Sequence, residues 1–134
     1  MDLARVLIVH GDLAPRLTLR TLLEAGGYAV DVAATLAEAM AKLDASQYEL
    51  VLSDASVGSR RVGGDVLSYA RVKDYRPATA HIIFNLNESP DRRLAGRSSR
   101  VAVRTENVPM LLGKVADLIG MRARRRYKLV PSGC

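Results

Sequence analysis

The sequence contains little cysteine and no long apolar run. Its one cysteine among 134 residues, Cys134, is the last residue, which excludes a disulfide framework and a cysteine-based metal site. No apolar run approaches the roughly 18 residues that a membrane-spanning helix needs, and the apolar stretch near the N-terminus is too short for a signal peptide. We therefore expect a cytoplasmic protein with no membrane span.

Motifs of the common enzyme classes are also missing. The sequence has no zinc-ligand spacing, no P-loop and no pattern typical of a catalytic triad. His10 and His81 have no metal ligands beside them in sequence, and we interpret His81 as a residue at the start of a strand. These absences indicate that the protein is not an enzyme and has no resident cofactor.

Acidic residues are absent from positions 121–134. The formal net charge is +6, and five of the 20 basic residues lie in this segment: Arg122, Arg124, Arg125, Arg126 and Lys128. The remaining 15 basic residues nearly balance the 14 acidic ones. We therefore predict a nearly neutral domain at residues 1–120 and a basic, disordered tail at residues 121–134 that binds anions, with nucleic acid as one candidate.

Short segments with strand-like patterns predict five strands, of which those at residues 6–9 and 48–54 are apolar runs typical of buried strands, while residues 28–32 alternate. The clearest run is YELVLSD at residues 48–54, which ends on Asp54. The other predicted strands are residues 6–9, 28–32, 81–86 and 101–103. Each run is too short for an independent helix, and strands that are apolar on both faces are typical of parallel sheets.

Helical patterns separate these runs. A first helix starts after Asp12, which is placed to cap it, and Thr35 with Glu38 forms a capping box for a second. A third helix starts at residues 63–64 and is broken by Pro77. Asn107 is expected to cap the last helix. The apolar face of that helix comprises Leu111, Leu112, Val115, Leu118 and Ile119.

The alternation of strands and helices predicts parallel βαβ units with right-handed crossovers. The expected fold is therefore α/β, with a doubly wound parallel sheet between two helical layers. In such a sheet Asp54 ends a strand at the edge where ligands bind. Its position leaves two interpretations open, namely a chemical role or a cap for the turn that follows.

Six stretches of the sequence match one family in order and nearly in spacing. They are LIV at 7–9, Arg16, LLEAGGYAV at 22–30, YELVLSD at 48–54, GGDVL at 63–67 and NVPMLLGKVADLIG at 107–120. Over about residues 4–120, the chain therefore resembles the CheY-like receiver domains of bacterial two-component response regulators. The resemblance implies a flavodoxin-like, three-layer αβα sandwich with strand order 2-1-3-4-5, and it implies that Asp54 accepts the phosphoryl group.

The metal-binding positions of that family are altered in this chain. The family holds Mg²⁺ with an acidic pair after the first strand, and here the pair is His10 and Gly11. Mg²⁺ prefers oxygen ligands, so an imidazole is a poor substitute. Asp12 lies one position further on, where it either caps the helix or reaches the metal through a water.

The positions that contact phosphate in the family are also altered. The family's lysine after the fifth strand corresponds to Arg104, and we expect its guanidinium close to Asp54. The hydroxyl residue that ends the fourth strand corresponds to Leu86, or to Asn85 if the register shifts by one. The aromatic residue that reports phosphorylation corresponds to Val101.

These substitutions favour a degenerate receiver, or pseudo-receiver. It would act as a phosphorylation-independent interaction module with a protein partner, either a histidine kinase or an effector. The alternative is a working receiver that a histidine kinase phosphorylates on Asp54 and that binds Mg²⁺ with Asp12 and Asp54.

The last segment also resembles the arginine-rich opening of a PilZ cyclic-dinucleotide domain through Arg122 and Arg126. The sequence ends too soon after this segment for a β-barrel, so either the chain is truncated or the likeness is accidental, and we favour the second interpretation.

Overall fold

The computed structural model describes residues 3–54, 63–83, 99–102 and 108–129. Within these ranges there are five strands and four helices, which alternate as far as β4. In chain order they are β1 (Arg5–Val9), α1 (Leu13–Ala25), β2 (Ala29–Ala33), α2 (Leu36–Ala45), β3 (Leu50–Asp54), α3 (Gly63–Arg71), β4 (Ala78–Ile83), β5 (Ser99–Ala102) and α4 (Val108–Leu129). Every strand pair is parallel and the order is β2-β1-β3-β4-β5, which confirms the predicted fold class.

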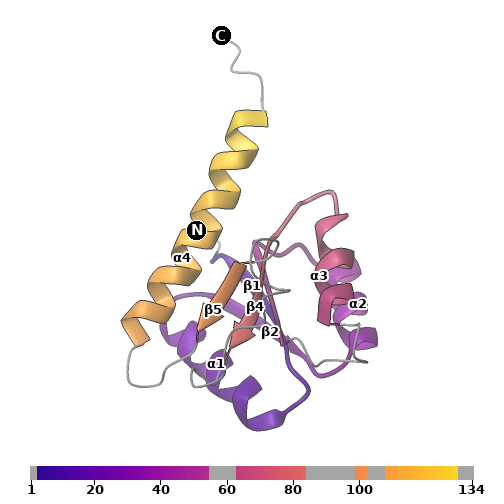
Figure 1. Cartoon of the computed structure of the whole chain (residues 1–134), viewed down its shortest axis with the longest axis vertical. Coiled ribbons are helices and arrows are strands. Elements are labelled where there is room, and N and C mark those ends of the chain that lie inside the picture. Colours follow the sequence, from indigo (N-terminus) through magenta and orange to yellow (C-terminus); the bar gives the residue numbers. More distant parts are fainter. Residues whose placement is uncertain (1–2, 55–62, 84–98, 103–107, 130–134) are drawn as a thin grey trace.

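Two apolar cores lie on opposite faces of the sheet. Helices α1 and α4 cover one face, and α2 and α3 cover the other (Figure 1). Successive strand residues point to opposite faces, so Ile8 and Leu52 enter the first core while Leu7 and Val51 enter the second. The predicted inner face of α4 is confirmed. Leu111, Val115 and Leu118 are buried, and Leu112 and Ile119 pack beside them.

The cap that Thr35 was predicted to form at the start of α2 is confirmed, with one difference in the reciprocal bond. The backbone N–H of Glu38 donates to Thr35 Oγ1 at 3.1 Å. In return, Glu38 Oε2 accepts a hydrogen bond from the backbone N–H of Ala34 at 3.0 Å. The first bond satisfies a donor that the first turn of a helix otherwise leaves without an intrahelical partner, and the second reaches the residue before the N-cap instead of the N-cap itself.

The boundary between α3 and β4 differs from the prediction. The helix ends at Arg71, six positions before Pro77, and a turn follows in which the N–H of Arg76 donates to Lys73 O at 3.0 Å. Arg76 has a positive φ of 43°, which ends this turn, and β4 starts directly after Pro77, at Ala78. The interpretation of His81 as the start of the strand was therefore wrong, because it lies inside β4 and is 4% exposed.

The C-terminal segment also differs from the prediction. Residues 121–129 were expected to be disordered, but α4 continues through them to Leu129 and extends beyond the rest of the molecule (Figure 1). This stretch has no glycine or proline and consists mainly of good helix formers, so nothing in it stops the helix. Residues 130–134 lie outside the described ranges. None of the described helices combines the length and apolar character needed to cross a membrane.

Candidate functional site

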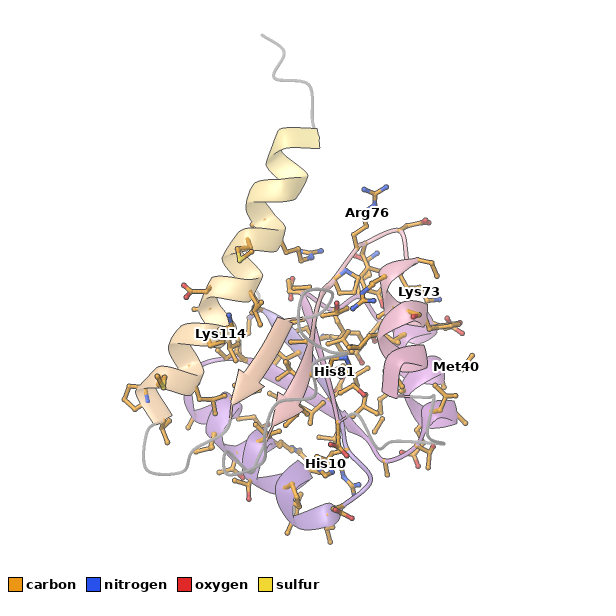
Figure 2. The ribbon with its side chains drawn as sticks, viewed as in Figure 1. His10, Met40, Lys73, Arg76, His81 and Lys114 are labelled. Atoms are coloured by element: carbon orange, nitrogen blue, oxygen red, sulfur yellow. The ribbon has the colours of Figure 1, made fainter. Side chains whose placement is uncertain are left out.

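Parallel pairing brings the ends of β1 and β3 together. Val9 is the register partner of Ser53, so the residues that follow on the two strands, His10 and Asp54, lie at the same edge of the sheet. We call this edge, where the strands end, the carboxyl edge. His10 Nε2 is 3.9 Å from Asp54 Oδ2, and the two side chains are 7% and 22% exposed. Figure 2 shows His10 in the segment that leads into α1.

Three hydrogen bonds hold His10 in place. Its backbone N–H donates to Ala33 O at 3.0 Å, and its carbonyl accepts from Arg16 Nη1 at 2.9 Å. The backbone N–H of Asp12 donates to His10 Nδ1 at 3.1 Å. An accepting Nδ1 carries a lone pair, so the heavy-atom geometry assigns the ring proton to Nε2. His10 therefore turns an N–H group toward the carboxylate of Asp54.

The contact between these two side chains is electrostatic. At 3.9 Å it is longer than the roughly 2.7–3.2 Å of a direct N–H···O hydrogen bond. Because both groups are mostly shielded from water, the attraction between the N–H dipole and the carboxylate is stronger than at a fully exposed surface. The arrangement can stabilise a negative charge on Asp54.

The described residues do not fit the Mg²⁺ site that receiver domains imply. Mg²⁺ demands near-octahedral oxygen ligands, and the first position of the acidic pair offers an imidazole whose Nε2 already carries a proton. Within the described ranges, no group of three or more His, Cys, Asp or Glu side chains could hold a metal ion. A metal at Asp54 would meet the hydrogen of His10 rather than a lone pair.

The predicted site residues have different outcomes. Asp54 lies at the carboxyl edge, as predicted. Asp12 occupies the N-cap position of α1 with extended backbone, but its side chain makes no capping hydrogen bond with the described helix, so the expected side-chain cap was wrong. Asn85, Leu86 and Arg104 lie outside the described ranges, and the contact between Arg104 and Asp54 stays a prediction.

Sequence reasoning missed the proximity of His10 and Asp54. It assigned His10 to a metal-ligand position of the family but considered only that the imidazole replaces an acidic ligand. The signal was nevertheless present, because two residues that follow neighbouring parallel strands must share one edge of the sheet. What the sequence could not show was the Asp12 hydrogen bond that sets the tautomer of His10.

The basic end of the chain is partly attached to the body. Arg122 Nη2 donates to Tyr75 O at 2.7 Å, and Arg122 Nε donates to Arg76 O at 3.0 Å. Of the predicted anion-binding residues, Arg122 is therefore a structural contact as well as a cation. The other four, Arg124, Arg125, Arg126 and Lys128, lie in the last turns of α4.

The comparisons with known proteins agree with the fold. Neither a protein-family model nor a curated protein matches the sequence. Among solved structures, the chain is similar to a CheY-like response regulator receiver domain protein from Methanospirillum hungatei, with 25% identity and a TM-score of 0.73. That match covers 92% of this chain and 99% of the other.

Two further structures show the same likeness. The chemotaxis protein CheY4 from Vibrio cholerae has 21% identity and a TM-score of 0.70, with 87% of this chain and 99% of that chain covered. The response regulator TrrA from Thermotoga maritima, solved in complex with Mg²⁺ and BeF, has 24% identity and a TM-score of 0.69. Here 86% of this chain and 98% of that chain are covered. The described architecture is the receiver-domain fold.

Proposed function

We propose that this chain, which has the receiver-domain fold of two-component response regulators, is a pseudo-receiver. Its partner is a histidine kinase or an effector protein, and binding does not depend on phosphorylation of Asp54. The observation that carries the proposal is the His10 N–H group at 3.9 Å from the Asp54 carboxylate, at the position where the family resemblance implies a metal ligand.

The chemistry of phosphoryl transfer supports this reading. The transferred group develops negative charge on its oxygens, and catalysis consists mainly of positioning and of neutralising that charge. The Thermotoga maritima protein was solved with Mg²⁺ and BeF, so a structurally similar domain does accept a divalent cation. In this chain His10 and Gly11 replace the acidic pair, which removes two oxygen ligands from beside Asp54.

The outer face of α4 is the surface that we assign to the protein partner. The inner face of the helix is occupied by the core, whereas Lys114 and Met110 are exposed. Figure 2 shows Lys114 on this helix. Met110 is 62% exposed, which is unusual for a large apolar side chain and common at protein interfaces. The proposed interaction domain comprises residues 1–120, and the helical extension after it is a separate binding element.

Phosphate labelling tests the proposal directly. The intact chain is incubated with acetyl phosphate and Mg²⁺, with Asp54→Asn as the matched control. We expect no difference in label between the two proteins. Labelling of the intact chain that Asp54→Asn abolishes would support the alternative, a working receiver that binds Mg²⁺ with Asp12 and Asp54.

Partner affinity gives the second half of this test. Asp54→Asn should leave the dissociation constant unchanged within about threefold, or ~0.7 kcal/mol. Lys114→Glu should weaken binding more, because it reverses a charge on the proposed interface. A tenfold change in affinity on acetyl phosphate treatment, absent from Asp54→Asn, would show a working switch.

A second candidate activity is anion binding by the end of α4. The observation that favours it is the pair of hydrogen bonds from Arg122 to Tyr75 and Arg76, because they fix the base of the basic segment on the domain. Helical backbone then carries four further cations away from the body. Such a segment gains affinity for a polyanion such as nucleic acid by releasing counterions.

A further inference from the structure

We infer that His10 is a positioning residue that takes the place of a divalent cation at Asp54, and that it excludes Mg²⁺ from the carboxyl edge. The inference rests on the proposed function and deepens it. A phosphorylation-independent receiver still contains a carboxylate at the end of β3, and that charge needs a compensating group. The Nε2–H of His10, at 3.9 Å from Asp54 Oδ2, contributes to that compensation.

The tautomer of His10 makes the exclusion specific. The Asp12 N–H donates to Nδ1, which must therefore present its lone pair to that donor. For Nε2 to coordinate a metal, the ring proton would have to move to Nδ1. Two hydrogens would then face each other between His10 and Asp12 at a heavy-atom separation of 3.1 Å. The same hydrogen bond thus aims a donor at Asp54 and blocks metal binding by the imidazole.

The backbone leaves room for the acidic pair that is missing. A Cβ atom at Gly11 would have Ala34 O as its nearest neighbour, at 3.9 Å, which is an ordinary contact. Among the described glycines, Gly27 is the one with positive φ, so Gly11 has no conformational need to be glycine. Steric constraint therefore does not explain the lost acidic pair, and the substitutions at positions 10 and 11 are a change of chemistry.

The first measurement identifies the tautomer in the intact protein. Long-range ¹H–¹⁵N correlations of the imidazole distinguish a proton on Nε2 from a proton on Nδ1. We expect the neutral ring of His10 to carry its proton on Nε2. A neutral ring protonated on Nδ1 would overturn the inference without any mutation, so this result does not depend on a variant that folds.

The second measurement is a Mg²⁺ titration followed through the amide signals of Ser53 and Asp54. The intact chain is compared with the double variant His10→Asp/Gly11→Asp, which restores two oxygen ligands. An aspartate at position 10 can still accept the Asp12 N–H, as in an Asx turn, so the local fold is retained. We expect the double variant to bind Mg²⁺ at least about tenfold more tightly than the intact chain.

A conservative variant separates positioning from packing. His10→Gln keeps an N–H donor near the place of Nε2, whereas His10→Ala removes it. We expect the Asp54 amide signal of His10→Gln to stay close to that of the intact chain and the signal of His10→Ala to shift. Equal shifts in both variants would mean that His10 only fills space.

The outcomes distinguish this inference from the proposed function. Equal Mg²⁺ affinity in the intact chain and the double variant would refute the inference. Phosphate labelling of Asp54 in the intact chain without Mg²⁺ binding would refute the proposed function and leave the role of His10 standing. Tighter Mg²⁺ binding by the double variant, together with the Nε2–H tautomer, supports the inference.

Discussion

The two edges of the sheet are held in different ways. At the amino edge, where the strands begin, Tyr75 Oη donates to Leu43 O at 2.9 Å and Arg122 donates to the carbonyls of Tyr75 and Arg76. At the carboxyl edge, His10 and Asp54 approach only to 3.9 Å. Figure 2 shows Arg76 and His10 toward opposite ends of the strands, with the last turns of α4 extending beyond Arg76. Within the described ranges, Tyr75 and Arg122 join elements at the amino edge by direct side-chain hydrogen bonds, whereas the contact between the His10 and Asp54 side chains at the carboxyl edge is a longer electrostatic one.

This difference indicates that residues important for stability and residues of the candidate site lie at opposite edges of the same sheet. In parallel α/β folds the ligand crevice lies at the carboxyl ends of the strands, so tight packing there would obstruct binding. The amino edge has no such constraint and can be closed by buried side chains. Tyr48, just before β3, is an example, because it is 1% exposed and donates to Asp31 Oδ2 at 2.7 Å. Mutations at the two edges should therefore have different consequences.

The largest expected effect is on stability, at the amino edge. Tyr48→Ala removes a fully packed ring from the core between the sheet and α2 and α3. We expect the free energy of unfolding to fall by about 3–5 kcal/mol, measured by urea denaturation. The control is Leu17→Ala on the outer face of α1, where the side chain is 45% exposed and the expected loss is below about 0.5 kcal/mol. Similar losses in both variants would contradict the contrast between packed and open regions.

Local sequence signals predicted most of the fold. The apolar runs at β1 and β3 and the helix cap at Thr35 depend on residues close in sequence, and the structure confirms them. Strand order followed from the family resemblance. The boundary at Arg71 was missed because Pro77 was read as the helix stop, whereas the helix had already given way to a turn.

The candidate site was less predictable because its geometry is tertiary. Asp54 was placed at the correct edge from its position after an apolar run. The hydrogen bond from Asp12 to His10 Nδ1 depends on the path of the backbone between β1 and α1, which no residue pattern specifies. The continuation of α4 depends in part on Arg122 reaching carbonyl groups 46 and 47 positions earlier in the chain.

The next effect separates the two parts of the α4 extension. Arg122 is hydrogen-bonded to the body of the domain, and the four basic residues that follow it are the predicted anion-binding residues. Ending the chain at residue 123 removes Arg124, Arg125, Arg126 and Lys128 but keeps Arg122. We expect salt-sensitive retention on heparin to be lost, since each phosphate-type contact contributes about 0.9 to the salt slope, while the melting temperature stays nearly unchanged. Unaltered retention would assign the anion-binding patch to the arginines at 92–104.

Ending the chain at residue 121 should add a loss of stability. Without Arg122 the carbonyls of Tyr75 and Arg76 lose a charged donor, which we expect to cost about 1–2 kcal/mol. Arg20→Ala is the matched control, because Arg20 pairs with Glu24 on the exposed side of α1, where such pairs contribute less than about 0.5 kcal/mol. Equal stability of the two shortened chains would mean that Arg122 does not secure the amino edge.

The smallest effect is the coupling within each polar pair, and it compares the two pairs most directly. Double-mutant cycles isolate a pairwise energy from the other contacts of each residue. For Tyr48→Phe with Asp31→Asn we expect a coupling of about 1–2 kcal/mol, because the hydrogen bond is short, charged and shielded. Burial, followed by this hydrogen bond, raises the pKa of Tyr48 above its ordinary value. For His10→Ala with Asp54→Asn we expect less than about 0.5 kcal/mol, because the atoms are too far apart for a direct hydrogen bond. A coupling at the carboxyl edge as large as that of Tyr48 and Asp31 would make His10 a stabilising contact and remove the distinction between the two edges.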